Sequence, residues 1–302
     1  ATDDVTVTVK ALPVITGTTT FAVGTSSDLN GTGTAASSNA WTSSNTAIAT
    51  VNSSTGLVQG VSAGSVTITY TDADGCSKTQ TVTITPLPII SGTLSVCVGS
   101  TTSLTGSGTS ASSSPWVSGN TSIATVTSSG VVAGVASGTT TYTDSYGGSA
   151  TQTVTVNSLP TVSAGSDQTV CSGSGVTLSG SGASSYSWNN GVSNGVEFNP
   201  TVTKTYTVTG TDANGCVNTD DVVVTVLSLP SISGATDVCI GASTTLSGSG
   251  SASSSSPWLS STTSVATINS SGVVTGVSAG TTTITYTDNN GCQITETVTV
   301  NG

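Results

Sequence analysis

The sequence predicts an all-β protein, a tandem array of four antiparallel β-sandwiches arranged end to end. A segment of about 70–75 residues recurs four times, and a period of this size is typical of an array of small domains. Within the copies, Val, Ile or Tyr alternates with Thr in short runs, as half-buried strands require. No run shows a helical period.

A Leu-Pro pair introduces each copy and sets the predicted boundaries. The pairs are Leu12-Pro13, Leu87-Pro88, Leu159-Pro160 and Leu229-Pro230. We therefore expect an N-terminal strand at 1–11, followed by four modules at 12–86, 87–158, 159–228 and 229–302. These segments are called the first to fourth modules below.

The alternating runs predict the long strands of the modules. They read SVTITYTD at 65–72, TVTIT at 81–85, TQTVTV at 151–156, TTTITYTD at 281–288 and TETVTV at 295–300. Gly residues and Ser-Ser pairs interrupt the sequence about every eight to twelve residues, which fits a sandwich of short strands.

Every module contains one Trp, and one Tyr in its penultimate strand. These residues are Trp41, Trp116, Trp188 and Trp258, with Tyr70, Tyr142, Tyr206 and Tyr286. Large aromatic side chains dominate burial in small domains, so we expect them to fill the cores. A platform on which a ligand stacks is the alternative.

A tight turn is predicted after each Tyr strand, from Asp72-Ala73-Asp74-Gly75, Asp212-Ala213-Asn214-Gly215 and Asp288-Asn289-Asn290-Gly291. Asp-Gly and Asn-Gly are strong hairpin signals. The alternative is a calcium site at Asp72, Asp74, Asp212 and Asp288, because Asp-x-Asp/Asn-Gly resembles the start of a calcium loop. That loop's downstream Glu is absent, and Asp144-Ser145-Tyr146-Gly147 offers too few oxygens. No other metal or cofactor is expected.

Three copies share a spaced pattern that resembles the bacterial immunoglobulin-like group 2 domain. Its residues in the first module are Ser43, Asn45, Ala49, Val51, Gly56, Val58, Gly60, Gly64, Ile68 and Tyr70. The third module looks more like the polycystic-kidney-disease-type or adhesin repeat of the Bacteroidetes, through VCSGSGVTLSGSG at 170–182 and YTVTGTDANGC at 206–216. These resemblances imply immunoglobulin-like sandwiches of the kind found in stalks, filaments and adhesins on bacterial surfaces.

Six cysteines in a charge-poor repetitive chain indicate an oxidising, extracellular setting. They occupy two recurrent positions. One lies just before the second strand of each module, at Cys97, Cys171 and Cys239, with Ala22 in the first module. The other follows the last hairpin turn, at Cys76, Cys216 and Cys292, with Gly148 in the second module.

Two pairing schemes follow from these positions. In an immunoglobulin-like sandwich the two cysteine positions lie at opposite ends of the module. In modules stacked end to end, one position therefore meets the other position of the next module, which would give Cys97–Cys216 and Cys171–Cys292. Ala22 would then face Gly148, and an intermolecular Cys239–Cys76 bond would join successive subunits. Pairing within modules, as Cys171–Cys216 and Cys239–Cys292, is the alternative.

The N-terminal segment ATDDVTVTVKAL matches NTDDVVVTVLSL at 218–229, the last strand of the third module. Val5, Val7 and Val9 would form one face of an assembly strand that adds to a neighbouring sheet. The alternative is that this strand is the cut end of a longer array.

Composition excludes several classes of function. Charged residues make up 6% of the chain, the net charge is −11, and the three basic residues are lysines. Nucleic-acid binding needs a basic surface, and membrane insertion needs about 20 apolar residues in a row; neither is present. The chain has no His. The adjacent carboxylates Asp3-Asp4 and Asp220-Asp221 would point to opposite faces of a strand, so we expect no enzyme.

We therefore predict a structural subunit of an extracellular bacterial surface filament or stalk, stabilised by disulfides and polymerised head to tail. Its expected partners are further copies or the neighbouring repeats of a longer array. The alternative is a segment of a cell-surface adhesin that binds glycans or surfaces, with Tyr186–Phe198 as its candidate loop.

Overall fold

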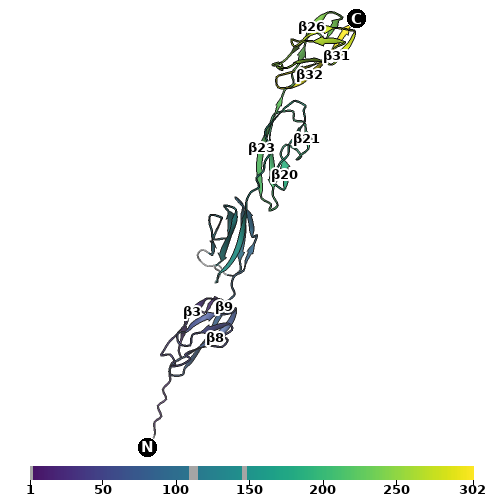
Figure 1. The fold of residues 1–302 in the computed structure, drawn as a ribbon. Helices are drawn as coiled ribbons and strands as arrows, with labels where there is room; N and C mark the ends of the chain where they lie inside the picture. Colours follow the sequence, from purple (N-terminus) through teal and green to yellow (C-terminus); the bar gives the residue numbers. More distant parts are fainter. Residues whose placement is uncertain (1–2, 109–114, 145–147) are drawn as a thin grey trace. The chain divides into compact units, whose positions relative to one another are not determined.

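The computed structural model describes residues 3–108, 115–144 and 148–302, and all regular elements in these ranges are β-strands (Figure 1). Among them no helix is long and apolar enough to cross a membrane. The chain divides into two compact units, Ala1–Leu159 and Pro160–Gly302, and each unit contains two hydrophobic cores.

The first module is a two-layer sandwich. Its strands are β1 (Ile15–Thr16), β2 (Thr20–Ala22), β3 (Ser26–Asp28), β4 (Asn30–Gly31), β5 (Trp41–Ser43), β6 (Ala49–Val51), β7 (Leu57–Gly60), β8 (Gly64–Thr71) and β9 (Ser77–Thr85). One sheet has the order β2-β9-β8-β5 and the other β3-β7-β6, while β1 pairs with β4. The predicted alternating runs form the long hairpin β8–β9, which Figure 1 labels.

The second module repeats this plan. Its strands are β10 (Ile90–Gly92), β11 (Ser95–Cys97), β12 (Thr101–Gly106), β13 (Trp116–Ser118), β14 (Ala124–Val126), β15 (Val131–Gly134), β16 (Gly138–Asp144) and β17 (Ala150–Asn157). The sheets have the orders β11-β17-β16-β13 and β10-β12-β15-β14. The turn predicted at Asp144–Gly147 and the Tyr142 side chain lie outside the described residues.

The third module keeps the larger sheet and shortens the other. Its strands are β18 (Gln168–Cys171), β19 (Val176–Thr177), β20 (Ser185–Trp188), β21 (Glu197–Phe198), β22 (Lys204–Thr211) and β23 (Val217–Leu227). The larger sheet has the order β18-β23-β22-β20, and β19 pairs with β21.

The fourth module returns to the plan of the first. Its strands are β24 (Ile232–Ser233), β25 (Asp237–Cys239), β26 (Ser243–Thr245), β27 (Ser247–Gly248), β28 (Trp258–Ser260), β29 (Ala266–Ile268), β30 (Val273–Gly276), β31 (Gly280–Thr287) and β32 (Gln293–Asn301). The sheets have the orders β25-β32-β31-β28 and β26-β30-β29, and β24 pairs with β27.

Aromatic side chains fill the cores, which confirms the structural interpretation of the tryptophans. Trp41, Trp116, Trp188 and Trp258 are 4, 6, 9 and 8% exposed. In the first module the rings of Trp41 and Tyr70 lie 4.6 Å apart, and Trp258 and Tyr286 repeat this spacing in the fourth. A Cβ atom at Gly31 would lie 2.4 Å from the Tyr70 ring, so this aromatic packing requires glycine there.

Each module also contains one short strand that runs parallel to the module's last strand, a pairing that period-two alternation does not predict. We call these strands the parallel strands; they are β2, β11, β18 and β25. Each ends at one of the recurrent positions, because Ala22 pairs with Thr85, Cys97 with Asn157, Cys171 with Leu227 and Cys239 with Asn301. The end of the parallel strand and the end of the last strand therefore lie side by side.

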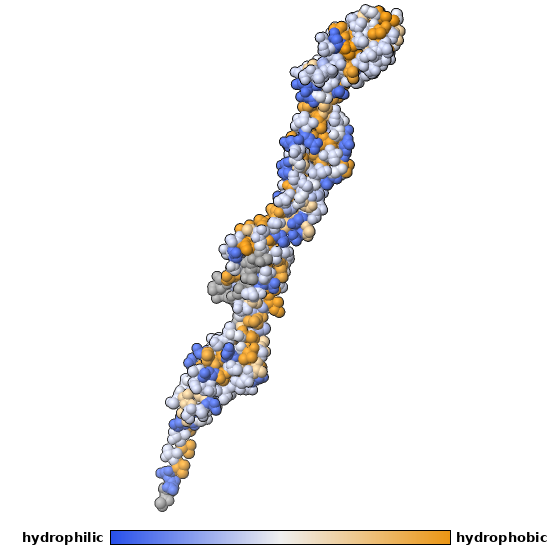
Figure 2. All heavy atoms as spheres, in the orientation of Figure 1, coloured by the Kyte–Doolittle hydropathy of each residue, from blue (hydrophilic) through white to orange (hydrophobic). Residues whose placement is uncertain are grey.

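The segment that precedes the first module carries exposed apolar side chains. Val5, Val7 and Val9 are 84, 80 and 90% exposed, and residues 3–12 form no strand. Figure 2 shows apolar residues on the surface of this N-terminal segment. Their counterparts by alignment in β23 are Val222, Val224 and Val226, of which the first two are fully buried. The same sequence pattern is therefore covered in the third module and uncovered at residues 5–9.

Candidate assembly site

A tight turn follows each parallel strand, and we call it the junction turn (residues 22–25, 97–100, 171–174 and 239–242). The fourth residue donates its N–H to the carbonyl of the first over 3.0–3.1 Å in every module. The third residue is a glycine with φ between +77° and +86°, as type II turns require. One backbone geometry therefore presents Ala22, Cys97, Cys171 and Cys239.

A carboxylate closes the hairpin that carries the other set of cysteines, and we call this the junction hairpin (residues 72–76, 212–216 and 288–292). The Oδ1 of Asp72 accepts hydrogen bonds from the backbone N–H of Asp74 at 3.0 Å and of Cys76 at 2.8 Å. Asp212 and Asp288 accept the equivalent pairs at 2.8 and 2.8 Å, and at 2.9 and 2.9 Å. The carboxylate thereby fixes the backbone at the cysteine.

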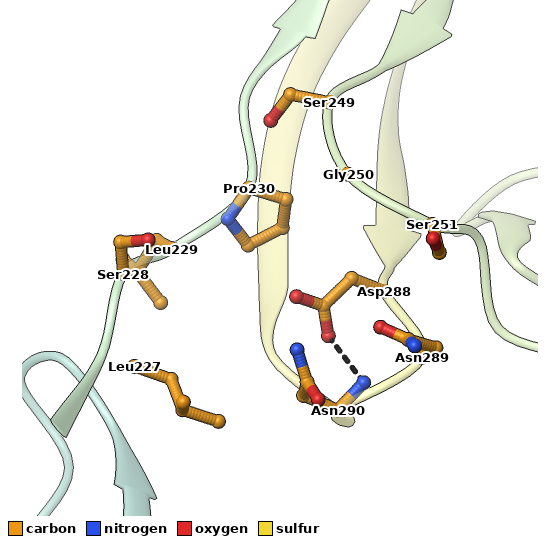
Figure 3. Close-up of a pocket in the computed structure, with 10 residues that line it drawn as sticks. All are labelled: Leu227, Ser228, Leu229, Pro230, Ser249, Gly250, Ser251, Asp288, Asn289 and Asn290. Atoms are coloured by element: carbon orange, nitrogen blue, oxygen red, sulfur yellow. Dashed lines mark hydrogen bonds between the residues drawn. The ribbon is translucent and has the colours of Figure 1, made fainter. Parts of the chain in front are cut away.

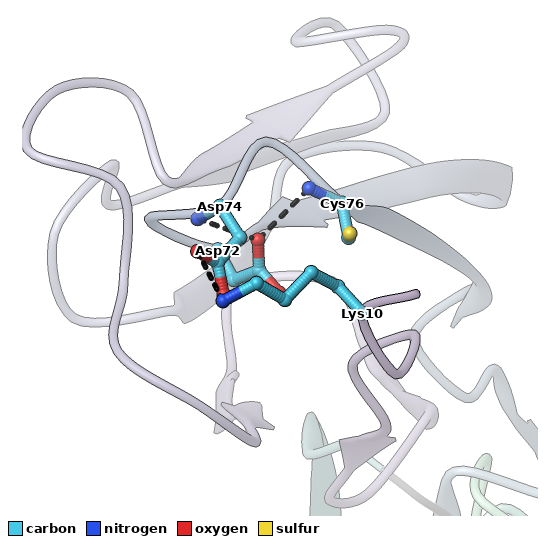
Figure 4. A network of polar contacts seen from close by, with 4 residues as sticks. All are labelled: Lys10, Asp72, Asp74 and Cys76. Carbon is cyan, nitrogen blue, oxygen red and sulfur yellow. Dashed lines mark hydrogen bonds and ion pairs between the residues drawn. The ribbon is translucent and has the colours of Figure 1, made fainter. Parts of the chain in front are cut away.

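This arrangement accounts for the calcium candidates as parts of the hairpin. Asp72 and Asp288 are 8 and 7% exposed, and each uses one oxygen to hold two backbone amides. Asp74 instead faces Lys10, with Nζ 3.2 Å from Oδ1 (Figure 4). Among the described residues, no three His, Cys, Asp or Glu side chains gather to hold a metal ion. The signal that recurs in sequence is therefore an Asp four residues before a Cys.

The structure joins the third and fourth modules through a disulfide between Cys171 and Cys292. The S–S distance is 1.98 Å and the Cα atoms lie 5.6 Å apart. Cys292 is fully buried. The junction turn of one module is thus bonded to the junction hairpin of the next, across the Leu229-Pro230 pair.

This bond contradicts the pairing within modules. Cys171 cannot also bond Cys216, and Cys239 is a free thiol rather than the partner of Cys292. The alternative fails because the parallel strand carries Cys171 to the end of the sandwich opposite its own hairpin. Cys97 and Cys216 are each disulfide-bonded, and Cys76 is the second free thiol.

The same two positions meet between the first and second modules, where neither is a cysteine. A Cβ atom placed on Gly148 would lie 2.8 Å from the Cβ of Ala22 and 2.8 Å from Cδ2 of Leu87. Such distances are shorter than van der Waals contact, so this junction fits a residue without a side chain. The expectation that Ala22 faces Gly148 is confirmed.

Two cavities adjoin the junction between the third and fourth modules. One, of about 260 Å³, is lined by Leu227–Pro230, Ser249–Ser251 and Asp288–Asn290 (Figure 3). The other, of about 360 Å³, lies along residues 171–174, Leu229, Gly291 and Gln293. Their linings are small polar residues and linker, without an aromatic side chain or a cluster of charges. They are shallow gaps between the junction turn, the linker and the junction hairpin.

The aromatic side chains of the candidate adhesin loop serve the fold of the third module. Tyr186 donates its hydroxyl to the carbonyl of Ala183 at 2.6 Å. The indole N–H of Trp188 donates to Oδ1 of Asn194 at 3.0 Å. The ring centroids of Phe198 and Tyr206 lie 5.2 Å apart. Tyr186 and Phe198 are half-buried against the core, so they present little ring surface to a ligand.

The two carboxylates of the pair Asp220-Asp221 have different surroundings. Asp220 is half-buried and its Oδ2 accepts the N–H of Ala164 at 2.8 Å, whereas Asp221 is exposed. Asp3 and Asp4 lie exposed in the N-terminal segment. Neither pair forms a two-carboxylate site of the kind used in acid–base catalysis.

Comparison with known proteins agrees with this architecture. The model of the bacterial Ig-like domain (group 2) matches residues 4–84 and 231–300, together half of the chain. Ice-binding protein 1 of Shewanella frigidimarina is 38% identical over 152 residues, which cover 44% of this chain and 16% of that protein.

Among solved structures, multidomain proteins match most of this chain at low sequence identity and low TM-score. The eight N-terminal Ig domains of Down Syndrome Cell Adhesion Molecule are 14% identical, with a TM-score of 0.31, covering 94% of this chain and 53% of that one. The insect immune protein hemolin is 13% identical, with a TM-score of 0.25, covering 96% and 99%. On the strength of the sandwich modules and the family match, the chain belongs to the bacterial immunoglobulin-like (group 2) domain family.

Proposed function

We propose that this chain is a structural part of an extracellular bacterial filament or stalk, whose modules are clasped to one another by disulfides. The observation that carries the proposal is the Cys171–Cys292 bond, which links a junction turn to the next junction hairpin. The only other covalent connection between the third and fourth modules is the chain itself, through the linker at Leu229-Pro230. A second covalent connection restricts the hinge at that linker, which is useful in a protein that must keep its length and direction.

The clasp also stabilises the modules that it joins. Its cysteines are 121 positions apart in sequence. In the chain-entropy model a loop of this size is worth roughly 4–5 kcal/mol, and measured values are typically about 2–4 kcal/mol. A domain of about 70 residues buries little surface, so this is a large share of its stability.

The second clasp in the proposal is Cys97–Cys216, between the second and third modules. Cys97 ends the parallel strand β11 and begins a junction turn, as Cys171 does. Cys216 follows Asp212 in a junction hairpin with the hydrogen bonds seen at Cys292. Both cysteines are disulfide-bonded, which supports this pairing.

The proposal assigns the N-terminal segment to the sheet of a further immunoglobulin-like module. Val5 and Val7 align with Val222 and Val224, which are buried in the third module, and Val9 aligns with the half-buried Val226. A strand with uncovered backbone and an apolar face is stable only when a sheet accepts it. Lys10, aligned with Leu227 at the end of β23, lies beside the junction hairpin through Asp74.

The composition and the disulfides support an extracellular, non-catalytic role. Disulfides persist in oxidising compartments. The exposed faces of the long hairpins carry threonine ladders, such as Thr67 opposite Thr81 and Thr69 opposite Thr79. Uncharged hydroxyl surfaces of this kind suit a solvated, repetitive scaffold.

A second candidate is a segment of a surface adhesin, and the similarity to Ice-binding protein 1 favours it. The match spans 16% of that protein, so this chain corresponds to a limited part of it. Glycan-array binding and ice-affinity measurements on the purified protein test this candidate. Retention on either would support adhesion by these modules.

The structural role is tested by imaging the purified protein in its oxidised form. We expect electron micrographs to show a narrow range of angles between the third and fourth modules, widening in a Cys171→Ser/Cys292→Ser variant. A Cys76→Ser/Cys239→Ser variant, which keeps the clasp, is the matched control. Equal angular spread in all three proteins would contradict the proposed role of the clasp.

A further inference from the structure

The two free thiols occupy the two halves of the clasp that joins the third and fourth modules. Cys239 lies at the start of a junction turn and pairs in register with Asn301, as Cys171 pairs with Leu227. Cys76 follows Asp72 in a junction hairpin, as Cys292 follows Asp288. One end of the fourth module and the opposite end of the first therefore carry complementary parts.

Exposure distinguishes the occupied positions from the unoccupied ones. Cys292 is fully buried beneath its bond to Cys171, whereas Cys76 is half-buried. Cys239 is exposed, and Ile240 beside it is 50% exposed. In the first module the equivalent Val23 packs against the core and is half-buried. The fourth module thus presents an apolar side chain and a thiol together at an uncovered turn.

A second observation shows that the contact does not depend on sulfur. Ala22 and Gly148 stand at the same two positions and touch between the first and second modules. The position that opens the junction turn and the position that follows the last hairpin turn therefore come together in both junctions that the structure describes, as Ala22 with Gly148 and as Cys171 with Cys292. A cysteine at each position then lies where a bond forms.

We propose that a second copy of this chain docks onto the first module, and that its Cys239 forms a disulfide with Cys76. The inference rests on the proposed function, because it extends the same clasp from neighbouring modules to neighbouring copies. Two thiols lose their protons and two electrons to a low-molecular-weight disulfide such as oxidised glutathione, which leaves as two reduced thiols. The contact is head to tail and does not use the same surface twice, so it extends into a filament wherever it does not close into a ring.

The register of the strands predicts what happens to the N-terminal segment. In the strand register Asn301 lies opposite Cys239, just as Leu227 lies opposite Cys171. In the sequence alignment of 1–12 with 218–229, Leu227 corresponds to Lys10. The last strand of a docked copy would therefore end at the position of Lys10. In this contact the last strand of the docked copy takes the place that the proposed function otherwise gives to residues 1–9. Deletion of residues 1–9 should therefore leave cross-linking undiminished.

The test uses two full-length variants, Cys76→Ser and Cys239→Ser, each retaining one of the two thiols and both halves of the Cys171–Cys292 clasp. Each variant is incubated alone, and the two are mixed, in a buffer of reduced and oxidised glutathione. Dimers are measured on non-reducing gels, and the linked peptides are identified by mass spectrometry.

We expect the mixture to form a dimer joined through Cys76 and Cys239, in about tenfold excess over either homodimer, because docking raises the effective concentration of the correct pair. A mixture that gives only the roughly twofold excess of random pairing, or no dimer, would overturn the inference. So would a loss of cross-linking after deletion of residues 1–9, which would indicate capture of that strand instead.

The same peptide analysis separates this inference from the proposed function. If the mixture fails to dimerise while the Cys171–Cys292 peptide is present, the contact between copies is wrong and the clasp within the chain stands. If the Cys171–Cys292 peptide is absent, the bond from which both proposals are argued does not form, and both proposals are contradicted.

Discussion

The junction between the first and second modules and that between the third and fourth use the same two positions with different chemistry. At the first junction Ala22 faces Gly148, and at the other Cys171 is bonded to Cys292. Because these two positions meet in both junctions, the contact does not depend on the disulfide. The disulfide adds a covalent restraint to a contact that the fold already makes.

Removing the disulfide should have the largest effect on stability and should make the two junctions most alike. We expect Cys171→Ser/Cys292→Ser to lower the unfolding free energy of residues 160–302 by about 2–4 kcal/mol, since the loop-closure restraint on the unfolded chain is lost. Urea unfolding followed by tryptophan fluorescence measures the change. Cys239→Ser, which removes a thiol without breaking a bond, serves as the control and should unfold like the parent protein.

The hairpin side of the comparison is tested at Asp288. Replacing it with Ala leaves the N–H groups of Asn290 and Cys292 without their acceptor, which should cost about 1–3 kcal/mol. Asp288→Asn keeps an oxygen at the same place and should cost less. Exposed Asp237→Ala is the matched control. Equal losses in the Asn and Ala variants would mean that the charge, rather than the acceptor, holds the hairpin.

The first junction can be converted into the second by Ala22→Cys/Gly148→Cys. Cβ atoms in disulfides lie about 3.8 Å apart, so the modules must separate by about 1 Å from the present contact. We therefore expect the bond to form, with a gain of about 1–2 kcal/mol, below the value for a native clasp. Thermal unfolding with and without reductant measures it. Absence of the bond under oxidising conditions would show that this junction differs from its counterpart.

The smallest effect is expected at the ion pair beside the first junction hairpin. Lys10 and Asp74 are each about half exposed, with their charged atoms 3.2 Å apart. Such pairs contribute about 0–1 kcal/mol, so Lys10→Ala should shift the urea midpoint very little. A change as large as that of Asp288→Ala would show that residues before Leu12 take a larger part in the first module.

Much of the fold is predictable from local pattern, and the reason lies in the long hairpins. In β8, Val66, Ile68 and Tyr70 alternate with threonines, so one face must be apolar, and these three side chains are buried. The Asp-x-x-Gly turns are equally local, because Gly75 adopts φ +83°. Short strands such as β3, with the sequence Ser-Ser-Asp, carry no such signal. Strand β3 forms because β7 provides a hydrogen-bonding partner for its backbone.

The candidate site is harder to predict, because it depends on how distant strands are paired. Spacing alone permits Cys171 to bond either Cys216 or Cys292. The deciding fact is the parallel pairing of β18 with β23, which carries Cys171 to the same end as Leu227 and the linker. The sequence predicts the turn at Asp288 but not that its carboxylate accepts the N–H groups of Asn290 and Cys292, since an Asp near a Gly-containing turn also suggests a calcium ligand. The available signal is the recurrence of an Asp four residues before Cys76, Cys216 and Cys292.

The central claim is that junction turns are clasped to the hairpins of the following modules, and disulfide mapping tests it most directly. The purified protein is alkylated and digested with pepsin at low pH, where few thiolates remain to exchange disulfides. Mass spectrometry should then find the Cys171–Cys292 and Cys97–Cys216 peptides. Peptides that link Cys171 to Cys216 or Cys239 to Cys292 would contradict the account.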